Sequence, residues 1–437
     1  MITGERLIRK PMKKYLSSIF SNFLYATLII ITAAILGYVC LIAVYSLPTQ
    51  SIRQNALTSA QTFLKNGDVY VWPKKVAGNK IDNYTPALML NMASFQNRYP
   101  AYKEALLNPR VEYINASRSA ELFFATQENT PPKEQIINYA RYWHGYLIFI
   151  KPLLIIGDIT IIRIINALCQ MTLLLFALYL IYKRLNIKQA LAFLTAILFL
   201  NPISTTLSVS YGSTYIIMLT AVIILLTQQK KFKIWQFFLS IGIITAYFDT
   251  LTAPLITLGF PLIIYTLLQK TNLRKDLIKI ISNSIAWGYG YLGMWLAKWI
   301  LASTITDENV IKDGFNNALY RTLGHNGQEI VKTKWSFAIA LRNNFAELWY
   351  SSSALIILTY LLLICLSYFI KKYRLTKDYR AILLLFIGTY PFFWYIVMMN
   401  HSIIHPLLSY RGLAITIYTL TASITICLKS SSQTKLH

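Results

Sequence analysis

The chain has 437 residues, of which 55% are hydrophobic and only 14% are charged, and its mean hydropathy is +0.47. Soluble proteins carry about a quarter charged residues, so this composition excludes an ordinary soluble enzyme and indicates a polytopic membrane protein. A formal net charge of +25 is by itself typical of nucleic-acid binding, but the basic residues lie in short loops between apolar segments, so we expect lipid and not nucleic acid as the partner.

Apolar stretches suited to membrane-spanning helices recur along the chain. We predict an all-α polytopic membrane protein with about ten transmembrane helices, since a span needs about 20 mostly apolar residues. The predicted spans are residues 23–46, 159–182, 189–206, 209–228, 234–249, 252–269, 278–301, 350–370, 381–399 and 412–428. The first follows a basic segment and has no small-residue cleavage site, so we interpret it as a retained anchor helix.

The distribution of Lys and Arg predicts the orientation. The segments 183–188, 230–233, 270–279 and 371–380 are strongly basic, and they alternate with connections near 204–208 and 249–252 that contain no basic residue. Basic loops stay in the cytoplasm, so we predict a multi-pass protein of the cytoplasmic membrane with both termini inside.

This orientation divides the chain into seven parts. They are a cytoplasmic N-terminus (1–22), the anchor (23–46), a large outer loop with a juxtamembrane helix (47–158), spans two to seven (159–301), a second outer loop (302–349), the last three spans (350–428) and a cytoplasmic tail (429–437).

Acidic residues and histidines concentrate on the predicted outer side. Of the 17 acidic residues, only Glu5, Asp276 and Asp378 fall on the cytoplasmic side. Four of the five histidines are on the outer side, namely His144, His325, His401 and His405. Proton transfer and metal binding depend on such groups, so any chemistry is expected at the outer face.

The first outer loop is polar and rich in proline. Runs at Pro86–Gln96, Tyr102–Leu107 and Lys133–Tyr142 predict short helices separated by Pro100, Pro109 and Pro131-Pro132. The apolar run Leu147–Ile156 is too short to cross a membrane and favours an interfacial or re-entrant helix.

Four local strings stand at the predicted outer ends of these segments: Asp82-Asn-Tyr-Thr85, Tyr142-Trp-His-Gly-Tyr146, Tyr247-Phe-Asp-Thr250 and Asn400-His-Ser-x-x-His405 with Tyr410-Arg411. Together with an anchor, a large first outer loop, a juxtamembrane helix and many spans, they resemble the GT-C superfamily of membrane glycosyltransferases, in an uncharacterised bacterial branch. The resemblance implies a GT-C-like fold and the transfer of a sugar from a polyprenyl-phosphate donor to a cell-envelope glycan, lipid or protein.

Two carboxylates are candidates for catalysis. Asp82 would take the acceptor proton or hold a metal against the leaving phosphate, and its alternative is an Asx-turn in Asp-Asn-Tyr-Thr-Pro. Asp249 lies between two spans, where carboxylates often mark a site, and its alternative is a helix N-cap that bonds the amides near Leu251 and Thr252.

Two further groups are candidates for substrate binding. Arg411 would grip the phosphate of the donor, and His401 and His405 would donate to the same phosphate or to a sugar. The histidine spacing also allows a metal pair, so a divalent metal is an alternative, although no third ligand is visible nearby. Tyr142, Trp143 and His144 are predicted to contact substrate, and an aromatic interface belt is the alternative.

Two other functions are alternatives to a glycosyltransferase. A flippase or transporter of a lipid-linked saccharide would need polar groups along a path through the bilayer, and a polysaccharide polymerase would share the outer-face chemistry. The Gly288-Tyr-Gly-Tyr-Leu-Gly293 string matches a dinucleotide fingerprint but follows no strand, so we interpret it as a close helix contact.

Overall fold

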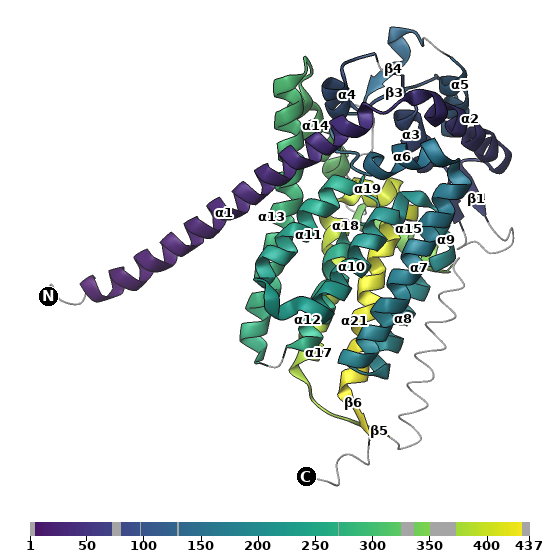
Figure 1. The fold of residues 1–437 in the computed structure, drawn as a ribbon. Coiled ribbons are helices and arrows are strands. Elements are labelled where there is room, and N and C mark those ends of the chain that lie inside the picture. Colours follow the sequence, from purple (N-terminus) through teal and green to yellow (C-terminus); the bar gives the residue numbers. More distant parts are fainter. Residues whose placement is uncertain are drawn as a thin grey trace.

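The computed structural model describes residues 5–71, 80–96, 98–128, 131–269, 271–324, 336–349 and 373–430. Long helices form a bundle, and shorter helices and strands form a cap at one end of it (Figure 1). We use the name cap for residues 49–156. The helix α7 (Ile159–Arg184) begins beside the cap and runs to the far end of the bundle, where the predicted basic loops lie (Figure 1).

The predicted spans that fall within the described residues are helical. Single helices form most of them, namely α1 (Glu5–Tyr45), α7, α10 (Gly212–Gln228), α11 (Ile234–Phe248), α12 (Leu255–Leu268), α13 (Leu273–Ile305) and α21 (Leu413–Cys427). Two are helix pairs, α8 (Ile187–Phe199) with α9 (Pro202–Leu207) and α17 (Tyr379–Gly388) with α18 (Tyr390–Val397). The all-α prediction is confirmed, and the predicted span 350–370 lies outside the described residues.

Prolines explain the breaks between α8 and α9 and between α17 and α18. Asn201 takes a left-handed conformation (φ 53°) and its side chain caps α9 by accepting from the Ser204 amide, while Pro202 occupies the first turn, where a missing N–H costs nothing. Pro391 plays the same part in the first turn of α18.

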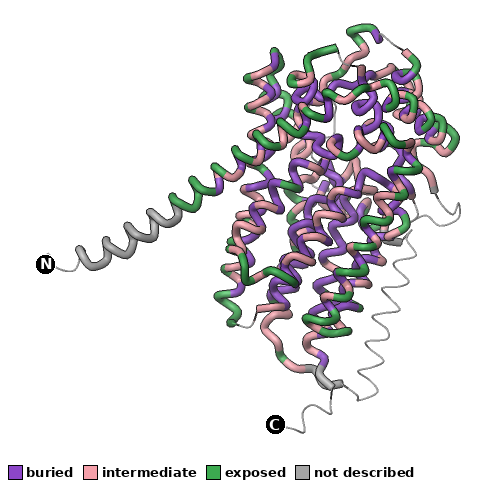
Figure 2. The backbone as a smooth tube through the Cα atoms, viewed as in Figure 1, coloured by how far each residue is buried: buried purple, intermediate pink, exposed green. Residues whose placement is uncertain are grey.

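Four helices of the described chain are long and apolar enough to cross a membrane: Phe20–Tyr45, Ile159–Arg184, Val209–Lys231 and Tyr379–Val397. Large apolar side chains on α7 face outward, with Leu168 63% exposed and Leu175 68% exposed. Buried residues run along the inside of the bundle (Figure 2). Apolar surface on the outside of such helices is the pattern of a membrane protein, and the number of ten spans stays a prediction.

The cap contains five helices and two short hairpins. The helices are α2 (Thr49–Asn66), α3 (Tyr84–Ala93), α4 (Ala101–Leu107), α5 (Arg118–Gln127) and α6 (Leu147–Ile156). The antiparallel hairpins pair β1 (Val69–Val71) with β2 (Lys80–Asp82), and β3 (Pro109–Val111) with β4 (Ile136–Asn138). The helices predicted in Pro86–Gln96, Tyr102–Leu107 and Leu147–Ile156 are thereby confirmed as α3, α4 and α6.

The helix predicted over Lys133–Tyr142 is wrong. Lys133–Gln135 form one 3-10 turn (η1), and Ile137 then pairs with Arg110 in the second hairpin. Two β-branched isoleucines after a diproline favour an extended strand, and the partner strand is 25 residues away in sequence, where a local pattern does not reveal it.

Smaller elements complete the bundle. They are η2 (Val209–Tyr211), η3 (Gln229–Lys231), α14 (Val310–Leu323), α15 (Ser336–Trp349), α19 (Met399–Ile404), α20 (Pro406–Ser409) and η4 (Tyr410–Gly412), with the antiparallel pair β5 (Tyr373–Leu375) and β6 (Leu428–Ser430).

Two glycines allow α11 and α13 to pack closely. A Cβ at Gly290 would collide with the backbone carbonyl of Leu239, and one at Gly242 would collide with the carbonyl of Trp287. Side chains larger than hydrogen would push the two backbones apart. The interpretation of the Gly288–Gly293 string as a helix contact is therefore confirmed at Gly290.

Two buried lysines bind carbonyl groups of cap helices, one from within the cap and one from α13. Lys151 of α6 donates to the carbonyl of Ala93 at the end of α3 (2.9 Å). Lys298 of α13 donates to the carbonyl of Ala105 in α4 (3.1 Å) and to Oδ1 of Asn108 (2.9 Å). Both lysines are fully buried, and a cation at a helix C-terminus satisfies free carbonyls and complements the helix dipole.

Candidate functional site

Asp82 is the last residue of β2, and it lies against the segment that leads into α10. Its Oδ1 accepts a hydrogen bond from the Thr85 amide (3.0 Å), and its Oδ2 accepts one from the Ser210 hydroxyl (2.8 Å). The Asp82 amide donates to the Ser208 hydroxyl (2.9 Å). The side chain is only 3% exposed. The Asx-type turn is thus present, and the same carboxylate also faces the bundle.

Arg411 of η4 is buried among tyrosines. Its Cζ lies 3.8 Å from the ring centroid of Tyr211 and 4.8 Å from that of Tyr410, which is cation–π geometry. Its Nη1 donates to the carbonyl of Leu407. Its Nε and the hydroxyl of Tyr211 are buried without a hydrogen-bond partner among the described residues. A buried guanidinium with an unused N–H has a free donor for an oxyanion.

Asp82 and Arg411 therefore contact two consecutive residues, Ser210 and Tyr211. Asp82 bonds Ser210, Tyr211 is the next residue, and Arg411 stacks on its ring. Burial lowers the pKa of Arg411, but Tyr211, Tyr410, Tyr215 and Asp82 raise it, and the net pKa is above the ordinary value. We name Asp82, Ser210, Tyr211 and Arg411 the Tyr211 cluster.

An ion pair stands beside this cluster. Lys80, two residues before Asp82, contacts Glu347 of α15 at 3.0 Å, and Glu347 also interacts electrostatically with Tyr211. The pair joins the cap to α15 and adds a second carboxylate that interacts with Tyr211.

Asp249 ends α11 and organises the connection to α12. Its carboxylate accepts hydrogen bonds from the Thr252 amide (3.0 Å) and hydroxyl, and from the amides of Thr250 and Leu251. Burial raises its pKa to about 6, although these hydrogen bonds lower it. The predicted bonds to the amides near Leu251 and Thr252 are thus present, but the prediction of a helix N-cap is wrong, because α12 begins at Leu255 with Pro254 as its N-cap. Leu251 is held at φ 68°, a conformation that costs a leucine about 1–3 kcal/mol and is typical of functional connections.

His401 and His405 lie with Arg321 of α14. Arg321 Nη1 donates to Nδ1 of His401 (3.1 Å), and the two histidine rings are 5.1 Å apart. Burial, and then the charge of Arg321, lower the pKa of His405 to about 4 and that of His401 well below its ordinary value. Both histidines are therefore neutral at pH 7. His401 also contacts the backbone of Leu251, next to Asp249.

The structure divides the predicted phosphate-binding group of His401, His405 and Arg411. Arg321 is the cation that affects both histidines, whereas Arg411 belongs to the Tyr211 cluster. We name Arg321, His401 and His405, with their neighbour Tyr142, the Arg321 cluster.

The segment Tyr142–Tyr146 packs against the Tyr247–Thr250 string. The amide of Gly145 donates to the carbonyl of Tyr247 (2.9 Å), and the Trp143 ring lies 5.4 Å from the Tyr247 ring. Trp143 also donates to the carbonyl of Met294 (2.7 Å). Two of the strings singled out in the sequence are therefore in direct contact.

His144 lies within this segment and uses both ring nitrogens. Its Nδ1 bonds the Tyr146 hydroxyl (2.9 Å) and its Nε2 bonds the Tyr139 carbonyl (3.0 Å). Burial, together with the nearby charge of Lys298, lowers its pKa to about 3. A neutral His144 thus donates from Nε2 and accepts at Nδ1, which orders the turn at its positive φ of 54°.

A cavity of about 260 Å³, counting the space open to solvent, lies between the start of α12 and the residues that flank Arg411. It is lined by Thr252 beside the Asp249 connection and by Ser409 and Gly412 on either side of the Tyr410–Arg411 pair. The aromatic residues Trp394 and Tyr395 of α18 form its other wall. A ligand in this cavity would lie between the connection at Asp249 and the residues that carry Arg411.

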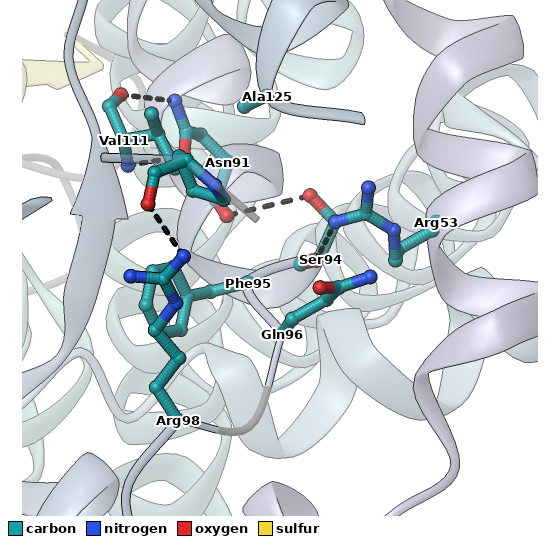
Figure 3. A pocket seen from close by; sticks show the side chains of 9 residues that line it. Arg53, Asn91, Ser94, Phe95, Gln96, Arg98, Val111 and Ala125 are labelled. Atoms are coloured by element: carbon teal, nitrogen blue, oxygen red, sulfur yellow. Dashed lines mark hydrogen bonds between the residues drawn. The ribbon is translucent and has the colours of Figure 1, made fainter. Parts of the chain in front are cut away.

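A second cavity, of about 250 Å³ by the same measure, lies within the cap (Figure 3). Arg53 lines it and donates to the carbonyls of Ser94 (3.3 Å), Thr126 (2.9 Å) and Glu128 (3.1 Å). These carbonyls are at the C-terminal ends of α3 and α5, so Arg53 acts as a helix cap. None of the predicted site residues lines this cavity.

Within the described residues, no three His, Cys, Asp or Glu side chains lie close enough together to hold a metal ion. His325 lies outside the described residues. The structure therefore adds no third ligand to the His401–His405 pair.

Comparison with known proteins returned no matching family model, no matching curated protein and no matching solved structure.

Several residues of these clusters had no sequence signal. Ser210 and Tyr211 stand in an uncharged connection, and Glu347 stands in a loop with no motif. Arg321 is one of several basic residues in the second predicted outer loop. The one usable signal is position, because Ser210, Tyr211 and Glu347 each lie near the end of a predicted span on the side that is rich in acidic residues.

Proposed function

We propose that this protein is a glycosyltransferase that uses a polyprenyl-phosphate-linked sugar at the extracytoplasmic face to modify a cell-envelope glycan, lipid or protein. The observation that carries the proposal is the Tyr211 cluster, in which a carboxylate from the cap bonds Ser210 and a guanidinium from η4 stacks on the next residue, Tyr211. The proposal includes a GT-C-like architecture, in which the cap is the large first outer loop.

The charge distribution supports the proposed sidedness. The cap end of the bundle holds Asp82, Asp249 and Glu347, whereas the far end holds basic residues such as Lys183 and Arg184 at the end of α7. Basic residues remain in the cytoplasm, so we infer that the cap end lies outside, where polyprenyl-phosphate sugars present their head groups after translocation.

Arg411 is the proposed phosphate-binding residue. Its unused Nε–H would bond a phosphate oxygen of the donor, and the tyrosine rings would hold the guanidinium plane in place. As the sugar–phosphate bond breaks, negative charge grows on the leaving phosphate. A fixed cation at that position stabilises the transition state more than the ground state.

Asp82 is the proposed general base. The acceptor hydroxyl attacks C1 of the sugar, the bond from C1 to the phosphate oxygen breaks, and its electron pair leaves with the polyprenyl phosphate. Asp82 takes the proton of the acceptor hydroxyl. A carboxylate has about four acceptor positions, so its bonds to Thr85 and Ser210 leave places for the substrate.

The decisive experiment is sugar transfer by the purified, full-length protein in lipid nanodiscs, with a synthetic polyprenyl-phosphate sugar and a panel of acceptors. Arg411→Ala is expected to raise the KM for the donor and to lower kcat, and Arg411→Lys is expected to restore part of the activity. Lys312→Ala is the matched control, since it removes an exposed cation from the cap end. Transfer at the wild-type KM by Arg411→Ala would exclude the phosphate role, and movement of an intact lipid-linked saccharide between leaflets without transfer would favour a flippase.

A further inference from the structure

Buried hydrogen-bond donors without acceptors gather around Tyr142. Among the described residues, Nε of Arg321, Nε1 of Trp295 and the hydroxyl of Tyr291 have no partner. Buried polar groups in proteins are nearly always paired, so each exception calls for an explanation. Three unpaired donors in one region indicate a place that is completed by an acceptor-rich ligand.

Ring contacts join Trp295 to both Tyr142 and Tyr291. The Trp295 ring is 5.2 Å from the Tyr142 ring and 5.6 Å from the Tyr291 ring. Arg321 interacts electrostatically with Tyr142, and Tyr291 interacts with both Tyr142 and Asp249. The donors therefore come from α13 and α14 and converge on the segment that contains Tyr142.

No carboxylate forms an ion pair with Arg321 in the described part of the chain. Asp249 interacts electrostatically with Tyr291, and its oxygens are already bonded by the amides of its own connection. The ring nitrogens of His405 have no hydrogen-bond partner among the described residues, and the ring is partly exposed. Arg321 is partly exposed as well, although its Nε is buried.

The combination of groups defines the ligand class. Aromatic rings pack on the apolar faces of sugars, as the large amphipathic surfaces of Tyr142 and Trp295 would. A guanidinium binds a carboxylate or phosphate with two parallel N–H bonds, which suits an oxyanion better than a neutral hydroxyl. Each feature alone is common, but together they suit a saccharide that carries a negative charge.

We propose that Arg321, Trp295 and Tyr142 form a subsite for an anionic sugar, one that carries a carboxylate or a phosphate. In this arrangement Arg321 binds the anionic group, Trp295 donates to a ring or hydroxyl oxygen, and Tyr142 covers a face of the sugar. Assigning this sugar to the acceptor depends on the proposed glycosyltransferase function, because Arg411 in the Tyr211 cluster then binds the donor phosphate. The acceptor of this enzyme is thus an acidic glycan.

Equilibrium dialysis of the full-length protein in nanodiscs tests the subsite with three probes, D-glucuronate, glucose 6-phosphate and D-glucose. At least one anionic probe is expected to bind about tenfold or more tightly than glucose, as a hydrogen-bonded charge would require. A preference for glucuronate identifies a carboxylate as the recognised group, and a preference for glucose 6-phosphate identifies a phosphate. Equal binding of all three probes would overturn the proposal.

Variants locate the binding. Arg321→Gln is expected to abolish the preference for the anionic probe, and Trp295→Phe, which keeps a ring and removes the N–H, is expected to weaken it by a smaller factor. Lys312→Gln is the matched control, because it removes an exposed charge from the same helix, α14. Arg321→Lys, which keeps the charge, is expected to retain part of the preference if Arg321→Gln proves unstable. An undiminished preference in folded Arg321→Gln would exclude the subsite.

Dialysis measures binding without transfer, so this result is independent of the transferase assay. Selective binding of an anionic sugar without any transfer activity would contradict the proposed glycosyltransferase function but support the subsite. Transfer to neutral acceptors only, with no preference for an anionic probe in dialysis, would contradict the subsite but support the proposed glycosyltransferase function.

Discussion

The guanidinium of Arg411 lies over the ring of Tyr211, with its Cζ 3.8 Å from the ring centroid, and the residue before Tyr211 donates a hydrogen bond to Asp82. One short segment at the start of α10 therefore holds a cation on one residue and an anion on the next. Arg411 and Asp82 come from opposite ends of the sequence, so this segment sets the distance between them.

Replacing the Tyr211 ring should release Arg411. Tyr211→Leu keeps an apolar side chain but removes the cation–π contact, which is worth about 0.5–2 kcal/mol. We expect a lower melting temperature and a higher KM for a polyprenyl-phosphate donor, because the guanidinium is no longer held in one plane. Thermal unfolding and transfer kinetics measure the two effects.

Tyr211→Phe is the control for that experiment. It keeps the ring and removes the hydroxyl, which has no hydrogen-bond partner among the described residues. Its KM for the donor should therefore stay close to wild type. A phenylalanine variant as impaired as the leucine variant would show that the hydroxyl, and not the ring, is what matters.

Two substitutions separate the structural and chemical roles of Asp82. Asp82→Asn keeps an oxygen that accepts from the Thr85 amide, so the turn should survive and the melting temperature should fall little. It removes the base, so the rate of transfer should fall by about 10²–10⁴-fold. Asp82→Ala removes both functions and should also destabilise the cap. Normal turnover by a folded asparagine variant would exclude Asp82 as the base.

Much of the bundle was predictable because lipid imposes a simple rule on sequence. The apolar segments at 159–182 and 278–301 recur as α7 and α13, since every backbone group in a membrane must be bonded within a helix. The cap follows no such rule. The strand at Ile136–Asn138 depends on pairing with a segment that is distant in sequence, and the local pattern favoured a helix.

For the candidate site, the sequence pattern predicted which residues are involved better than it predicted which of them lie together. Sidedness correctly placed Asp82 and Arg411 at the same end of the bundle, and both proved to contact the Ser210–Tyr211 segment. The histidines were grouped with Arg411 because they are close in sequence. The turn at Pro406–Ser409 separates them in space, and Arg321 from another helix becomes their cation.

Gly145 should be intolerant of a side chain. A Cβ there would lie 2.6 Å from the carbonyl oxygen of Tyr247 and would also meet its ring. Gly145→Ala is expected to cost about 1–3 kcal/mol, because the Tyr142–Tyr146 segment must move away from the Asp249 connection. Gly288→Ala is the matched control, since its Cβ would meet nothing within 4 Å and alanine favours a helix. Equal melting temperatures for the two variants would contradict the close contact.

Glu104 of the cap should make stability depend on pH. Its Oε1 accepts from the amides of Arg98 (2.9 Å) and Tyr99 (3.2 Å), and its Oε2 is buried without a partner among the described residues. Burial raises its pKa from 4.5 to about 7, although these two hydrogen bonds and the charge of Lys151 lower it. The carboxyl is therefore protonated in the folded protein at pH values where it is ionised in the unfolded chain.

The sign of the pH effect follows from this difference. Between pH 4.5 and about 7 the folded state holds a proton that the unfolded state has lost, so the free energy of unfolding falls as pH rises through this window and is level above it. The full effect is about 1–3 kcal/mol. Glu104→Gln mimics the protonated form, so we expect a higher melting temperature than wild type at pH 8 and a flatter profile from pH 5 to 8. Glu134→Gln, which changes an exposed carboxylate of the cap, should keep the wild-type profile, and an unchanged slope in Glu104→Gln would show that this carboxyl is ionised in the folded cap.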